Sequence, residues 1–249
     1  MASNYYENES VLKIPGYDIY FTRFSDSIIV DHFADAIDEL ETILGNFYIQ
    51  ESQIIEGGGG KSSITQALET ALKDAGWIKE KIESEHHVRG KVLTSESHEV
   101  DHYKEFEEGN IGLEIEWNNK DPFYDRDLEN FRKLHQIGEM SVGIIITRGE
   151  SLQEELYYVF SRFLNSIYPF TIDDLIEKLS LSVKASKRIS KFIGLPKDNS
   201  IEKIANDLYK SKYGTATTHM SKLLLRIDRG VGNPCPCVLI GIGADRLTK

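Results

Sequence analysis

The chain has 249 residues, 40% hydrophobic and 28% charged, a composition typical of a globular protein and a length that allows one large domain or two small ones. No apolar run reaches the roughly 18 residues of a membrane span and the N-terminus is polar and acidic, so we expect neither a membrane protein nor an exported one. The formal net charge of −11 argues against broad contact with nucleic acid, because phosphate contacts require Lys and Arg.

Apolar periodicity predicts the elements of the first half. In chain order these are a helix over 31–45, a short strand over 47–55, a helix over about 64–75, a charged loop over 78–100 and a strand over 111–117. Ser62 or Ser63 would cap the second helix, and Gly76 would end it.

The second half alternates helices and strands. We expect a helix over 125–136, a buried strand over 141–147, a helix over 152–164, a Lys-rich helical stretch over 171–212, a helix over 222–229 and a buried strand over 237–241. Strands that alternate with helices around a short central sheet indicate an α/β fold.

The segment 111–117, Ile-Gly-Leu-Glu-Ile-Glu-Trp, alternates apolar and polar residues as a half-buried strand does. Glu114 and Glu116 would therefore project side by side, with the apolar residues toward the core. Two neighbouring carboxylates repel unless a proton or a cation joins them, and a hard divalent cation such as Mg²⁺ takes oxygen ligands. A third acid, Asp101, lies upstream. The competing interpretation is a solvent-facing strand with ordinary acids.

These three acids suit phosphodiester hydrolysis. A metal bound by Asp101 and Glu114 would lower the pKa of a bound water and stabilise charge on the phosphate. Glu116 would bind a second metal or orient the attacking water as a general base.

The residues after the acidic strand favour the catalytic interpretation. They read Asn-Asn-Lys-Asp-Pro-Phe-Tyr-Asp-Arg-Asp-Leu over 118–128. An Asp, a Glu-x-Glu strand ending in an aromatic residue, a polar pair and another aromatic residue together resemble the type II restriction endonucleases of the BglII and BstYI group. The pattern is more distantly similar to BamHI, within the PD-(D/E)XK superfamily. The likeness continues in patches at 64–77, 142–146 and 230–242.

The resemblance implies a restriction-endonuclease-like core, a short mixed central β-sheet flanked by helices. It implies Mg²⁺ as the cofactor, with Asp101, Glu114 and Ile115 as metal ligands and Glu116 as the third active-site group.

The family also takes an active-site residue from the helix before the sheet, and that position falls at Thr65 or Gln66. Residues 1–249 would form a single endonuclease domain. The stretch 150–212 is longer than in relatives and would form a helical insertion or subdomain.

Two polar stretches are candidate DNA contacts: Asn118, Asn119, Lys120 and Arg126 after the acidic strand, and Thr215, Thr217, Thr218 and His219 before a helix. Asn pairs with adenine and Arg with guanine in the major groove, and small hydroxyl residues suit phosphates or base edges. The competing interpretations are helix capping for the second stretch and, for Arg126, a surface ion pair with Asp125 or Asp127.

The glycine run 57–60, with Lys61 and Ser62 after it, resembles the end of a P-loop. That motif requires a glycine where this chain has Ile55, so we favour a flexible turn at a helix N-terminus. Four histidines lie loosely around Asp101 with no metal-binding spacing, and we expect solvated loop residues there: His86, His87, His98 and His102.

The sequence therefore predicts a Mg²⁺-dependent, site-specific endonuclease of double-stranded DNA from a restriction–modification system. Palindromic sites match two-fold protein symmetry, so we expect a homodimer, with the 125–136 helix as a dimer element by analogy. The alternatives are a repair nuclease of the same fold and a P-loop nucleotide-binding protein. Cys235 and Cys237 are too close in sequence for ordinary disulfide geometry. We expect both to be reduced and partly buried, in a cytoplasmic protein.

Overall fold

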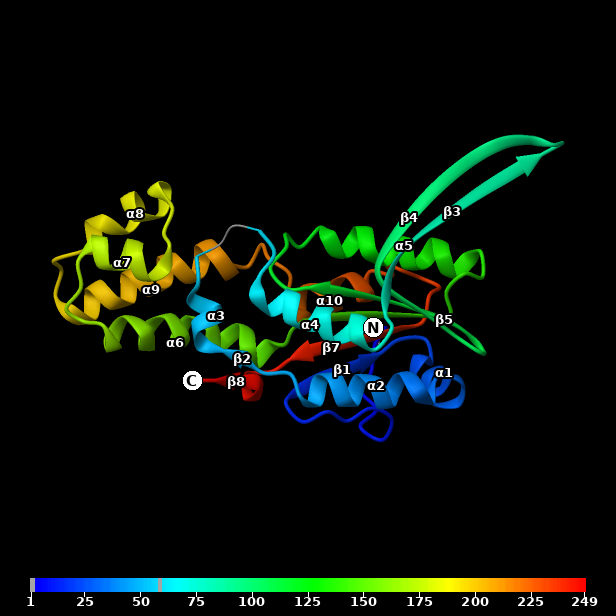
Figure 1. Cartoon of the computed structure of the whole chain (residues 1–249), viewed down its shortest axis with the longest axis horizontal. Helices are drawn as coiled ribbons and strands as arrows, with labels where there is room; N and C mark the ends of the chain where they lie inside the picture. The colour runs from blue at the N-terminus through cyan, green and yellow to red at the C-terminus, as the bar shows by residue number, and fades with distance from the viewer. Residues whose placement is uncertain (1–2, 58–59) are drawn as a thin grey trace.

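A six-stranded mixed sheet lies at the centre of the computed structural model, which describes residues 3–57 and 60–249 (Figure 1). The strand order is β1–β7–β6–β5–β4–β3, in which β5, β6 and β7 run parallel and the other neighbours antiparallel. The six strands are β1 (Tyr17–Phe21), β3 (Ile78–Val88), β4 (Lys91–Phe106), β5 (Gly109–Glu116), β6 (Val142–Arg148) and β7 (Cys237–Ile242). The expected α/β fold with a mixed central sheet is confirmed.

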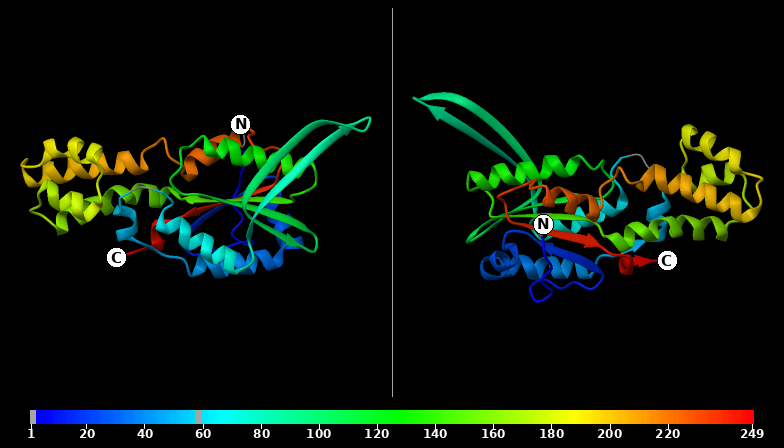
Figure 2. Two further views of the ribbon diagram at one scale, coloured as in Figure 1. Left: turned by 45° about the horizontal axis from the view of Figure 1, so that its top comes forward. Right: turned by 180° about the vertical axis from the view of Figure 1, so that it is seen from behind.

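Helices flank both faces of the sheet (Figure 2). Those of the first half are α1 (Ser25–His32), α2 (Ala34–Gly45), α3 (Glu51–Ile55), α4 (Ser63–Asp74) and α5 (Phe123–Gln136). Those of the second half are α6 (Glu150–Ser166), α7 (Ile172–Leu179), α8 (Val183–Ile189), α9 (Lys197–Tyr213) and α10 (Met220–Asp228). Two 3₁₀ turns, η1 (Ser190–Phe192) and η2 (Ala244–Arg246), and a parallel pair of short strands, β2 (Ile49–Gln50) and β8 (Leu247–Thr248), complete the chain.

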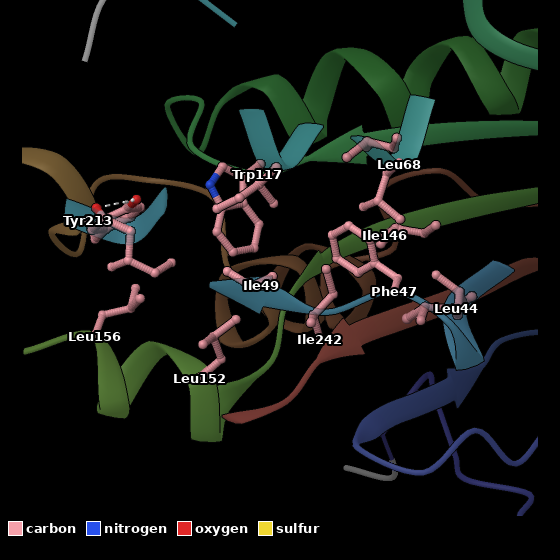
Figure 3. Close-up of a cluster of buried hydrophobic side chains, with 14 of the residues drawn as sticks. Leu44, Phe47, Ile49, Leu68, Trp117, Ile146, Leu152, Leu156, Tyr213 and Ile242 are labelled. Carbon is pink, nitrogen blue, oxygen red and sulfur yellow. Dashed lines mark hydrogen bonds between the residues drawn. The ribbon is translucent and has the colours of Figure 1, made fainter. Parts of the chain in front are cut away.

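Two apolar clusters fill the two faces. The smaller one packs α5 and α10 against the sheet. The larger one packs α2, α4 and α6 against the other face and continues into α7, α8 and α9. Figure 3 shows its middle, where Trp117 lies on the side of Tyr213 of α9, and Ile146 of β6 lies near Leu68 of α4 and Phe47. The helical segment around α7–α9, which forms one end of the molecule in Figure 1, thus shares a continuous core with the sheet.

The acidic strand differs from the half-buried strand expected from its alternation. Every residue from Ile111 to Glu116 in β5 is buried, because α5 covers one face and the larger apolar cluster covers the other. The alternation is retained: Leu113, Ile115 and Trp117 belong to the larger cluster, whereas the two glutamates face α5.

The expected loop over 78–100 is wrong, since β3 and β4 form a long antiparallel hairpin there. Its turn is Arg89-Gly90, with φ of 50° and 75°, the left-handed conformation of a two-residue hairpin turn. Both faces of the outer part are exposed, so no apolar alternation marks it in the sequence.

The expected strand over 47–55 is also mostly wrong. Only Ile49 and Gln50 form a strand, and α3 follows at once. Its N-terminus is fixed by a reciprocal capping interaction between Gln50 and Gln53. Both cysteines are free, as expected, and fully rather than partly buried. Among the described residues, no helix has the length and apolar character to cross a bilayer.

Candidate active site

The pairing of β4 with β5 places Asp101 beside Glu114. His102 is paired with Leu113, and one residue further along the ladder the Asp101 N–H donates to Glu114 Oε1 at 3.3 Å. Asp101 is therefore a strand residue rather than one that stands before a loop. Its side chain is 47% exposed, whereas Glu114 is buried behind it.

A fourth acid that the sequence interpretation missed, Asp127, completes the cluster. It comes from α5, whose buried face rests on the glutamate side of β5. Arg126 Nε donates to Asp127 Oδ1 at 2.8 Å, and its Nη2 lies 3.7 Å from Glu116 Oε1. Asn119 Nδ2 donates to Glu116 Oε2 at 2.9 Å. The helical spacing of Asp127 with Tyr124 and Phe131 on the buried face of α5 was the available signal.

The positive charge near these four acids is too small to keep all the carboxylates ionised, so the pKa values of the three buried ones are raised. Burial first, and then the charges of Asp127 and Asp101, raises the pKa of Glu114 to about 9. Burial and Asp127 raise the pKa of Glu116 to about 9, and burial also raises the pKa of Asp127. Asp127 Oδ2 is buried without a hydrogen-bond partner. An oxygen-rich site with an unpaired buried oxygen fits a hard divalent cation.

Ile115, the predicted main-chain ligand, lies on β5 beyond the end of the β4–β5 ladder. The β4–β5 ladder ends at the pair of His102 and Leu113, so β5 beyond that point has no partner on this side. Ile115 lines the same pocket as Asp101. Across residues 3–57 and 60–249, no three His, Cys, Asp or Glu side chains are arranged to hold a metal by themselves. Mg²⁺ is commonly held by one or two carboxylates plus water and substrate oxygens, so this arrangement suits it.

Asp101 and Glu116 line a pocket of about 480 Å³ together with residues of α4 and α5, whereas Glu114 and Asp127 are buried and do not line it. Residues from four parts of the chain line it, among them Asp101, Glu116, Ser62, Thr65, Glu69, Arg126 and Lys212. Thr65 faces this pocket, whereas Gln66 is exposed and donates to Lys61 O at 2.9 Å. Glu69, one turn after Thr65 on α4, lines the pocket and forms an ion pair with Lys61. The i, i+4 spacing from Thr65 could have indicated Glu69.

Lys212 is a second pocket residue that the sequence interpretation missed. Its Nζ donates to Ile54 O at 2.8 Å and to Glu56 O at 2.6 Å. Burial lowers its pKa to about 8. Among the described residues, no carboxylate forms an ion pair with it, so its positive charge is free to act on a bound anion.

The two predicted DNA-contact stretches lie side by side. Lys120 forms a β-bridge with Thr217, and Thr218 N–H donates to Asn119 O at 2.8 Å. Asn118, Lys120 and Thr217 line a second pocket, of about 470 Å³, next to the acidic one. Thr215 is exposed beside them. The structure thus brings together side chains that are far apart in sequence.

Arg148 of β6 stabilises the junction, the place where residues 118–120 contact residues 215–219, from within the protein. It is fully buried, and its guanidinium donates from Nε to Thr218 O at 3.1 Å and from Nη2 to Thr217 Oγ1 at 2.7 Å. The Thr218 side chain is itself fully buried, and His219 is 9% exposed. In this conformation these two residues support the junction rather than face a ligand.

The remaining candidate residues lie apart from the acids or in a different geometry. His98 and His102 are buried, which corrects the expectation of solvated histidines, because His98 contacts Asn130 of α5 and His102 contacts the Leu113 main chain of β5. Only His86 and His87 are exposed. At the glycine run, Gly58 and Gly59 lie outside the described residues. Helix α3 rather than a strand precedes the run, and Ser62 caps α4 by accepting from Thr65 N–H, so the P-loop arrangement is not reproduced.

The fold and the acidic pocket agree with a comparison of the whole sequence against protein families. The model of the family described as restriction endonuclease BglII/BglIII matches residues 17–242. No curated protein shows a significant match. Since the match covers β1 through β7 and all four acids, the chain belongs to the BglII/BglIII family of restriction endonucleases.

Proposed function

We propose that this chain is a Mg²⁺-dependent type II restriction endonuclease that hydrolyses double-stranded DNA at a palindromic site, as a cytoplasmic homodimer. The observation that carries the proposal is the cluster of Asp101, Glu114, Glu116 and Asp127, where α5 packs on β4 and β5. A buried group of carboxylates is costly to fold unless it serves to hold a cation or a proton.

Asp101 and Glu114 would hold the metal through their carboxylates, and Ile115 through its main-chain oxygen. When bound, Mg²⁺ lowers the pKa of an attached water and neutralises charge on the phosphate. Asp101, the exposed member, is reached first by solvent and ligand. The Asp101 N–H donates to Glu114 Oε1, which keeps the Glu114 carboxylate beside Asp101.

Glu116 would accept the proton of the attacking water. With no cation bound, a pKa of about 9 keeps Glu116 protonated near neutral pH, so it would act as the base only when a bound cation lowers that pKa. Asn119 fixes one of its oxygens by donating to it. The water oxygen bonds to phosphorus, the bond from phosphorus to one ester oxygen breaks, and that oxygen takes a proton from solvent, which gives a phosphate end and a hydroxyl end. Asp127 lies beside Glu116 and is held by Arg126, so it would limit the groups to which Glu116 could pass that proton.

DNA would follow the two adjoining pockets. Both are lined by Gly57, Asn118 and Lys212. In the proposed contact set, Asn118, Asn119, Lys120, Arg126, Thr215 and Thr217 face the duplex, with Thr218 and His219 behind them. Arg126 would have to exchange its ion pair with Asp127 for a base or phosphate. The segment 150–212 would act as a subdomain of the single endonuclease domain 1–249.

The homodimer follows from the proposed palindrome, because two identical strands require two identical sites. The outer face of α5 is available for a dimer contact, since only its inner side is buried. Sedimentation of the free chain and of its DNA complex checks this part of the proposal.

Plasmid cleavage tests the proposal. Wild type with Mg²⁺ should yield discrete fragments with mapped ends, and Glu114→Ala should abolish cleavage while binding to the same DNA with Ca²⁺ persists. Glu105→Ala is the matched control, an exposed acid on the same strand as Asp101. Full cleavage by Glu114→Ala would overturn the site. Random fragments from wild type would favour a repair nuclease.

A further inference from the structure

The outer part of the hairpin of β3 and β4, residues 79–99, contributes no side chain to the four-acid cluster. It stands clear of the body in all views (Figures 1 and 2). Its base belongs to the active-site region, since Lys79 Nζ lies 3.4 Å from Asp101 Oδ1. The hairpin therefore sets the distance between the acids and any molecule that its far end contacts.

Charge is divided sharply along this arm. The shaft, residues 79–85 and 96–99, carries five glutamates and two lysines. The tip, residues 86–95, carries Arg89 and Lys91, with His86 and His87, and has no acid. All four of these side chains are exposed. In a chain of net charge −11, this places an isolated cationic group at the far end of an acidic stem.

The arm is built to avoid pairing with another strand. Its outer strand β3 is the edge of the sheet, and charged residues alternate along it, as in Lys79, Lys81 and Glu83. Such edges discourage the addition of a second strand. A two-stranded ribbon does, however, match the width of the DNA major groove. The basic tip fits a polyanion better than a protein edge.

The length of the arm sets what it can reach. Lys91 and Asp101 are ten residues apart on β4, and at roughly 3.3 Å per residue the tip lies up to about 30 Å from the acid. One step of duplex DNA is about 3.4 Å, so the tip can reach up to about nine base pairs from the bond next to Asp101.

We propose that the tip of the β3–β4 hairpin, through Arg89 and Lys91, binds the phosphates of DNA that flanks the cleaved site. The inference rests on the proposed function, because it takes the cleaved duplex as the ligand. The contact adds affinity without reading bases, since Lys and Arg at phosphates carry no sequence information. The acidic shaft keeps the duplex off the rest of the arm.

The test compares two duplexes that carry the mapped cleavage site, one with flanks of about 3 base pairs and one with flanks of about 15. Binding is followed by fluorescence anisotropy with Ca²⁺. The double variant Arg89→Asn/Lys91→Gln removes both charges, and Asn tolerates the positive φ at position 89. We expect about tenfold weaker binding to the long duplex, a salt slope smaller by about 2, and no change on the short one.

Controls separate this contact from other roles. Lys81→Gln removes a lysine charge from the shaft of the same hairpin and should leave both affinities unchanged. Equal losses on both duplexes, or none on the long one, would overturn the proposal. Weaker self-association of the free tip variant would assign the tip to a second copy instead. Failure of the proposed function shows separately, as absence of plasmid cleavage by wild type, whereas failure of the arm shows in an enzyme that cuts normally.

Discussion

The two faces of β5 are equally excluded from water and have opposite physical consequences. Leu113 and Trp117 face the larger apolar cluster, where burial is worth about 25 cal/mol per Å². Glu114 and Glu116 face α5, where burial works against their charged forms. One face of the strand stabilises the fold, whereas the other buries carboxylates at a cost in free energy that a bound cation would reduce. Adjacent residues of β5 thus have different roles: one stabilises the fold and the next belongs to the acid cluster.

The largest effect should come from the acid face. Glu114→Gln keeps the shape but removes the charge, so we expect cleavage to fall at least about 1,000-fold. The free energy of unfolding at neutral pH should stay equal or rise, because Gln is buried neutral without the proton that Glu114 must take up on folding. Plasmid cleavage rates and urea unfolding measure the two quantities. Loss of stability together with activity would break the division between the faces.

The apolar face should give the reverse result. Leu113→Ala should lower the free energy of unfolding by about 2–5 kcal/mol through the lost burial and the cavity left behind. Cleavage by the remaining folded protein, measured well below its melting temperature, should stay within a few-fold of wild type. A loss as large as that of Glu114→Gln would show that the two faces act as one unit.

The pH dependence of stability sharpens the comparison. Glu114 binds its proton more tightly in the folded chain, where its pKa is about 9, than in the unfolded chain, where it is 4.5. Without metal, its contribution therefore favours folding most below pH 4.5 and falls by about 1.4 kcal/mol per pH unit between 4.5 and about 9. Thermal unfolding across this range should show the decline in wild type and a shallower one in Glu114→Gln.

Added Mg²⁺ should raise the melting temperature more at pH 8 than at pH 5, because the ion competes with the protons on the same carboxylates. An equal rise at both pH values would mean that the ion binds elsewhere. Glu114→Gln is the control, and its rise at pH 8 should be smaller.

The smallest effect should come from a neutral hydrogen bond on the acid face. Tyr124 OH lies 2.6 Å from Thr147 Oγ1, which in turn donates to Glu116 O at 2.7 Å. Tyr124→Phe should cost about 1 kcal/mol of unfolding free energy and change cleavage less than tenfold. Thr147 still holds the Glu116 main chain in this variant. A larger loss of cleavage would place Tyr124 in the catalytic machinery.

The sequence by itself determined the local features. Alternation over 111–117 predicted the strand with both glutamates on one face. Helix α4 was predicted with a cap at Ser62 or Ser63, of which Ser62 is the cap, and with its end at Gly76. These features depend on hydrogen bonds and side-chain periods within a few residues, which the sequence carries directly.

Only the tertiary structure decided which distant residues meet. Asp127 joins the acids because α5 docks on β5, and Arg148 ties the end of β6 to residues 217–218, about seventy positions away. The β3–β4 hairpin was missed because both faces of its outer part are in water, so no apolar period records its register. Such contacts are selected by packing between elements, and packing leaves no mark in local sequence.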